Sequence, residues 1–190
     1  MRARLLTREL IELPEKFAAF VETTNQRLDT LEAGVQSLKT DVQGLRDDMG
    51  ILKGAHARNV AREDAATIAR AMGLRCTKTL TRDELWDLTE AVDTSGIPPN
   101  VLRSFRRADL IMEAADPTDE PCYIAVEISF TANGRGTTRA IRNAEFLTKY
   151  TGKPARAAIA GLRHDHQIQA HIDSGIVFWY QLEPADLEAE

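Results

Sequence analysis

Two acidic side chains interrupt neighbouring apolar segments in the middle of the chain. Asp109 lies within residues 107–112 (RADLIM), and Glu127 lies within residues 123–129 (YIAVEIS). Both segments have the composition of β-strands, and side chains alternate between the two faces of a strand. If the strands pair antiparallel, the two carboxylates can lie on one face. Hard oxygen ligands of this kind suit Mg²⁺ or Mn²⁺, which could lower the pKa of a water that attacks a phosphodiester.

The residue two positions after Glu127 limits this prediction. A lysine there would hold and polarise the attacking water and offset the charge that develops at phosphorus, but the chain has Ser129. A cation on the following helix could take its place, and the candidates are Arg139, Arg142 and Lys149. An arginine stabilises charge but cannot act as a base, because it stays protonated. Two hypotheses stay open: a nuclease with a displaced cation, or a domain that binds without cutting.

This arrangement resembles the PD-(D/E)XK nuclease superfamily, whose restriction-endonuclease-like fold has an αβββαβ core. Asp109 matches the first strand acid of the family, Glu127 the second, and Ser129 the position of the lysine, over roughly residues 60–181. Glu63 matches the acid often found on the first core helix. The resemblance implies metal-dependent cleavage of DNA. It makes Asp109, Glu127 and Glu63 candidate metal ligands, and Asp109, Glu127, Ser129, Arg139 and Arg142 candidate catalytic residues.

The helix expected at about 137–150 carries polar residues where this family places side chains that face the site. They are Arg139, Arg142 and Asn143. Seven basic residues and only one acid lie between Arg135 and Arg163, so this part of the chain could contact a phosphate backbone. The candidates for nucleic-acid binding are Arg135, Arg139, Lys149 and Lys153. The alternative is an ordinary solvated helix face, which the sequence supports equally well.

A heptad repeat runs without a break from Phe17 to Leu52 and predicts a coiled coil. The a positions are occupied by Val21, Leu28, Val35, Val42 and Met49, and the d positions by Phe17, Thr24, Leu31, Leu38, Leu45 and Leu52. Valine at a with leucine at d favours two parallel strands. An amphipathic helix packed against its own domain is the alternative.

The charges beside this repeat agree with a parallel homodimer. In such a dimer each g residue faces the e residue five positions later on the partner helix, and three of these pairs are attractive: Arg27 with Glu32, Asp41 with Arg46, and Asp48 with Lys53. Exposed pairs contribute only a few tenths of a kcal/mol each, so they select orientation more than they stabilise. A coiled coil ahead of a nuclease-like domain also resembles a group of prokaryotic proteins.

The remaining pattern predicts an α/β domain after the coil. We expect a coiled-coil helix over 1–56, a restriction-endonuclease-like mixed sheet flanked by helices over 57–184, and an acidic tail over 185–190. Helices are predicted at about 60–72, 81–92, 99–107, 137–150 and 164–173. Thr81 and Glu84 predict a capping box at the start of the second of these, and the glycines in residues 132–136 predict a flexible turn. Strands are predicted at about 74–80, 108–114, 122–130, 156–161 and 176–181.

Composition and net charge limit the classes of protein to which the chain can belong. The chain has 190 residues, a formal net charge of −5 and two cysteines. The negative charge argues against a broadly basic nucleic-acid binder but leaves room for a local basic face. Unpaired cysteine spacing, the absence of a secretory leader and the absence of a long apolar run predict a cytoplasmic protein with no membrane contact.

Overall fold

The computed structural model describes residues 2–183, with side chains from residue 10 onward. The chain divides into two units, Met1–Gly50 and Ile51–Glu190. The acidic tail predicted over 185–190 lies outside the described residues. Within residues 2–183, no helix is both long and apolar enough to cross a membrane.

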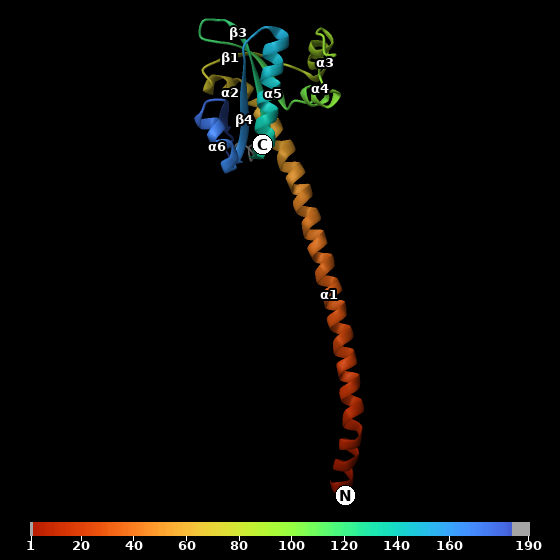
Figure 1. Cartoon of the computed structure of the whole chain (residues 1–190). Helices are drawn as coiled ribbons and strands as arrows, with labels where there is room; N and C mark the ends of the chain where they lie inside the picture. Colours follow the sequence, from red (N-terminus) through yellow and green to blue (C-terminus); the bar gives the residue numbers. More distant parts are fainter. Residues whose placement is uncertain (1, 184–190) are drawn as a thin grey trace. The chain divides into compact units, whose positions relative to one another are not determined.

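The first unit consists of one helix, α1 (Arg2–Glu63), which continues into the second unit (Figure 1). The predicted separate helix over 60–72 is wrong, because α1 runs through Val60 without a break. A turn at Asp64 then separates α1 from α2 (Ala65–Ala71). The apolar residues of the predicted heptads are exposed along α1, from 38% at Val21 to 68% at Leu52.

The second unit holds a five-stranded mixed sheet in the order β1-β2-β3-β4-β5. The first three strands are antiparallel, and β3, β4 and β5 are parallel. The predicted α/β class with a mixed sheet flanked by helices is confirmed. The strands are β1 (Arg75–Thr79), β2 (Leu110–Ala115), β3 (Pro121–Ala132), β4 (Ala155–His164) and β5 (Val177–Gln181).

Four further helices follow the predicted order: α3 (Arg82–Glu90), α4 (Pro99–Phe105), α5 (Gly134–Thr151) and α6 (His166–Asp173). The capping box predicted at the start of α3 is confirmed, since the Thr81 hydroxyl accepts from the Glu84 backbone N–H and the Glu84 carboxylate accepts from the Thr81 N–H. The predicted flexible turn over 132–136 is wrong. Asn133 caps the helix there, so α5 begins at Gly134.

The sheet separates two apolar layers. Residues of β3 alternate between them, so Ile124 and Val126 pack with the end of α1 and with α2, while Tyr123 and Ala125 pack with α3 to α6. Glu127 has the same parity as Ala125 and therefore projects into the layer that α5 covers. The strand pattern thus directs a carboxylate into an apolar interior, where it requires polar partners.

Candidate carboxylate site

Asp109 and Glu127 lie at the same edge of the β2–β3 ladder. Leu110 pairs with Val126 in the antiparallel register. Asp109, which precedes Leu110, therefore stands beside Glu127, which follows Val126. The Asp109 Oδ2 accepts a hydrogen bond from the Ile128 backbone N–H at 3.0 Å. The structure therefore brings the two acids together at this edge, although Asp109 stands in the bend before β2 and not within the strand predicted over 108–114.

Two side chains from α5 hold the Glu127 carboxyl group, which is only 3% exposed. Arg139 Nη2 lies 2.9 Å from Oε2, and Asn143 Nδ2 donates to Oε1 at 3.1 Å. Residues four apart on a helix share a face, so one face of α5 supplies both contacts. A buried carboxylate is stable only with such partners.

The Glu127 carboxyl group has a raised pKa. Burial raises the pKa of Glu127 to about 8, and the Asp109 charge and its hydrogen bond add to this effect, while Arg139 and Arg142 oppose it. Burial and the neighbouring acid therefore favour the protonated form of Glu127, whereas the arginines of α5 favour its ionised form.

Several buried polar atoms near the pair have no hydrogen-bond partner among the described residues. They include Nε of Arg139, Nε of Arg142 and Oδ1 of Asn143. Arg142 donates through Nη2 to the Ser104 hydroxyl at 2.6 Å, which ties α5 to α4. Free donors on two arginines beside a carboxylate pair are suited to bind an anionic ligand.

Ser129 does not take the place of a lysine. Its hydroxyl donates to the Thr131 carbonyl at 2.7 Å, so it is directed back to its own strand. The neighbouring strand passes very close here: a Cβ atom on Gly161 would stand 2.4 Å from the Ser129 carbonyl oxygen and 3.1 Å from the Trp179 ring. Glycine in β4 therefore permits the close approach of the two strands beside the site.

A cavity of about 230 Å³ opens beside the pair. Its lining, of which Asp109 is not part, combines the C-terminal half of β3 and one residue of β4 with the first turns of α5: Glu127, Ile128, Ser129, Ala132, Asn133, Arg135, Gly136, Arg139 and Ile159. The Asn133 side chain caps α5 by accepting from the Arg135 and Gly136 N–H groups. The cavity thus joins a carboxylate, two arginines and the positive end of a helix dipole, and it has room for a phosphate group.

The structure does not bring every predicted site residue to this place. Glu63 is exposed at the end of α1, and within residues 2–183 no three His, Cys, Asp or Glu side chains gather into a group that could hold a metal. Lys149 lies ten residues beyond Arg139, about 15 Å further along α5, and Lys153 contacts the Tyr123 ring. Of the predicted basic residues, Arg135, Arg139 and Arg142 are therefore the ones that lie near Glu127.

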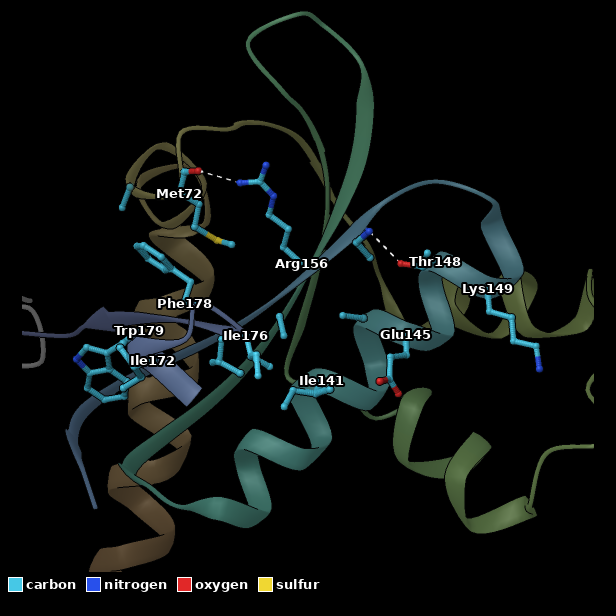
Figure 2. A pocket seen from close by; sticks show the side chains of 16 residues that line it. Met72, Ile141, Glu145, Thr148, Lys149, Arg156, Ile172, Ile176, Phe178 and Trp179 are labelled. Atoms are coloured by element: carbon cyan, nitrogen blue, oxygen red, sulfur yellow. Dashed lines mark hydrogen bonds between the residues drawn. The ribbon is translucent and has the colours of Figure 1, made fainter. Parts of the chain in front are cut away.

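A larger groove, of about 860 Å³, lies elsewhere on the second unit and shares no residue with the carboxylate cavity. Figure 2 shows apolar side chains around it, among them Ile141, Ile172, Ile176 and Phe178. Arg156 reaches from its edge to the Met72 carbonyl at 3.4 Å. Its lining has one carboxylate, Glu145, so it lacks the paired acids that a metal site would use.

Three residues outside the predicted set support the pair. Arg62 donates through Nε and Nη2 to the Asp109 carbonyl at 3.0 and 2.9 Å, Ser104 holds Arg142, and Asn133 caps α5. Asn133 could have been found, because asparagine before a helical segment is a capping signal. Arg62 and Ser104 left no local signal, since they reach the site from distant parts of the chain.

The chain matches no protein-family model, no curated protein and no solved structure. Its function therefore has to be derived from the geometry of this site.

Proposed function

We propose that this chain is a metal-dependent nuclease that acts on DNA. The proposal depends on one observation above all: Asp109 and Glu127 lie side by side, and burial together with the Asp109 charge raises the pKa of Glu127 to about 8. Two carboxylates forced together are stabilised when a proton or a cation lies between them. A divalent metal could replace that proton.

The order of elements supports the resemblance to the PD-(D/E)XK superfamily. The end of α1 and α2, then β1, β2 and β3, then α5 and β4, follow the αβββαβ order, with α3 and α4 inserted between β1 and β2. The antiparallel pairing of the first three strands and the parallel pairing of β3 with β4 supply a frame in which a hairpin presents two acids. The same frame brings the polar face of α5 over them.

The donor set fits Mg²⁺ or Mn²⁺. Both ions accept one or two protein carboxylates and fill their remaining positions with water and phosphate oxygens, so the lack of a third acidic ligand is compatible with binding. Asp109 and Glu127 would hold the ion, which would supply charge neutralisation and a more acidic water. Because Glu127 must lose its proton first, metal affinity is expected to rise with pH.

The α5 arginines could supply the positive charge that the missing lysine would otherwise give. Arg139 contacts Glu127, and Arg135 and Arg139 both line the adjoining cavity, where their guanidinium groups could bind the phosphate. Arg142 lies behind them, held by Ser104. Since arginine does not release a proton, these residues would stabilise charge and orient the phosphate, while a base would have to come from elsewhere.

Plasmid cleavage tests this proposal. Wild type, Glu127→Gln and the control Glu120→Gln, an exposed acid just before β3, would be incubated with supercoiled DNA and Mg²⁺ or Mn²⁺. We expect nicking by wild type and by the control but not by Glu127→Gln. Equal cleavage by Glu127→Gln would identify a contaminant and overturn the proposal.

Metal binding provides a second readout. Calorimetric titration with Mn²⁺ at pH 7.0 and pH 8.5 is expected to show tighter binding at the higher pH, and no binding to Glu127→Gln. Absence of binding to wild type at both pH values would rule out the metal site.

Arg139→Gln should abolish cleavage and leave Mn²⁺ binding in place, while Arg139→Lys should restore part of the cleavage.

A second function is favoured by a separate observation. The Ser129 hydroxyl donates a hydrogen bond to the Thr131 carbonyl. The residue at the position of the family lysine therefore has no positive charge and no free hydrogen-bond donor. The domain could therefore bind nucleic acid or a protein partner without catalysis. A mobility shift that weakens with salt, with no cleavage in either metal, would favour this function.

We propose further that the chain is a parallel homodimer. The exposed heptad residues of α1 and the three attractive g–e pairs support it. Two sites in one dimer could address the two strands of a duplex. Light scattering at micromolar concentration should give twice the chain mass, and Leu38→Glu should give the mass of a single chain. A wild-type protein with the mass of one chain would contradict the dimer.

A further inference from the structure

We infer that the dimer interface of α1 continues beyond the heptads, from Phe17 back to Leu10, with a shift of phase. The occupant of this additional surface is the same segment of a second copy. The inference rests on the proposed dimer and adds a part of α1 that the heptad repeat does not include.

The N-terminal part of α1 carries its own regular apolar spacing. Leu10, Leu13, Phe17, Phe20 and Thr24 follow one another in steps of three, four, three and four residues. Leu10, Leu13, Phe17 and Phe20 are 57–67% exposed. This spacing is that of a coiled-coil seam, and large apolar side chains gathered on one helix face indicate a partner.

The two seams join through one irregular step. From Thr24 the next seam residue is Leu28, so two steps of four follow each other before the regular alternation resumes. Such an insertion is a stutter, which locally unwinds a left-handed supercoil without interrupting the contact. Both Phe20 and Val21 can then face the partner, which explains two adjacent exposed apolar residues at this point.

Pro14 supports the shifted phase. If the heptads were extended backward unchanged, Pro14 would occupy an a position inside the seam. Proline lacks an N–H group, so the Leu10 carbonyl loses its helical partner there. In the shifted phase Pro14 stands beside the seam, where that carbonyl can reach water. Lys16 flanks the shifted seam.

The partner is a second copy because the surface is continuous with the heptad seam. A dimer that pairs Arg27 with Glu32 and Asp41 with Arg46 sets the two chains parallel and in register. The same register brings each residue from Leu10 to Phe20 opposite its own counterpart. For a different partner to bind this end, the two helices of the dimer would have to separate at Thr24.

Charge insertion in the full chain tests this inference. Leu13→Glu and Phe20→Glu place a carboxylate in the shifted seam. The control Ile11→Glu places one outside the seam, at a residue that is 72% exposed. Sedimentation equilibrium would give the dimer dissociation constant. We expect about a tenfold increase for each seam variant, because an unpaired charge is unfavourable between apolar surfaces, and no change for Ile11→Glu.

Leu38→Glu separates the two proposals. If Leu38→Glu dissociates the dimer while Leu13→Glu and Phe20→Glu leave the constant unchanged, the N-terminal seam is absent and the heptad dimer stands. If wild type itself has the mass of one chain, the dimer proposal fails first. Phe20→Leu, which keeps an apolar side chain in the seam, should retain wild-type affinity, and a weakening equal to that of Phe20→Glu would also overturn the inference. Unchanged tryptophan fluorescence would show that the second unit of each variant is folded.

Discussion

The helices α1 and α5 both carry apolar stripes, but they use them differently. On α5 the stripe is buried within its own unit, with Ala140 and Leu147 fully covered, and its polar face supplies Arg139 and Asn143 to Glu127. On α1 the heptad stripe stays exposed in the single chain, as at Leu38, which is 65% exposed. One helix therefore completes a site within the fold, and the other leaves its apolar stripe exposed, as the proposed dimer requires.

The largest expected difference comes from truncating one leucine on each helix. Leu147→Ala should lower the free energy of unfolding of the second unit by about 3 kcal/mol, because it leaves a cavity in the core. Leu38→Ala should leave that value unchanged and weaken only the dimer. Urea unfolding followed by tryptophan fluorescence measures this, since Trp86 and Trp179 both lie in the second unit. Equal losses from both variants would contradict the comparison.

The same substitution, glycine to alanine, should change stability in opposite directions in the two regions. Gly161→Ala should destabilise the second unit by about 2 kcal/mol, because the new Cβ would clash with the Ser129 backbone. Gly44→Ala meets no atom within 4 Å and should stabilise α1 by about 1 kcal/mol, since alanine favours helix. Thermal unfolding followed by circular dichroism and by fluorescence would separate the two effects. A stable Gly161→Ala variant would show that β3 and β4 can move apart.

The pH dependence of stability should distinguish the buried Glu127 from exposed acids. The pKa of Glu127 is raised to about 8, so the folded state binds more protons than the unfolded state between about pH 4.5 and 8. Stability should therefore fall as pH rises through this range, by at most ~1.4 kcal/mol per pH unit. Carboxyl groups with a lowered pKa, such as Glu84, change protonation below that pH range, so they do not contribute to this slope.

Urea midpoints at pH 5.5, 6.5, 7.5 and 8.5 would measure this slope. Glu127→Gln should flatten it, whatever its effect on absolute stability, while Glu120→Gln should leave it as in wild type. The same slope in Glu127→Gln and wild type would show that another group carries the proton.

The smallest effect concerns the charges beside the α1 heptads. Arg46→Asp should weaken the proposed dimer by about 0.5 kcal/mol at low ionic strength, because it opposes Asp41 of the partner chain. The double exchange Asp41→Arg with Arg46→Asp should restore affinity, and 1 M salt should remove the difference. Sedimentation in low and high salt measures both. If the double exchange is as weak as the single one, the helices do not pair in the parallel register.

Local signals in the sequence were enough to predict much of the fold. The capping box at Thr81, the alternation of apolar residues in β3 and the heptads of α1 each depend on neighbours within a few residues. The helix start at Asn133 was missed because glycines at 134 and 136 predicted a turn. The break expected before Val60 was wrong, because the lapse in heptads marks a change in what α1 packs against and not the end of the helix.

The sequence by itself determined which residues could do chemistry: two acids in neighbouring apolar segments, a serine two residues after the second acid, and arginines on the next helix. Those are matters of residue type and spacing. Only the tertiary structure decided that Glu127 is buried against Arg139 and Asn143, that Arg62 and Ser104 hold the site from distant segments, and that Lys149 and Lys153 lie away from it. Burial and long-range contacts set the pKa of a carboxyl group, and neither can be read from its neighbours along the chain.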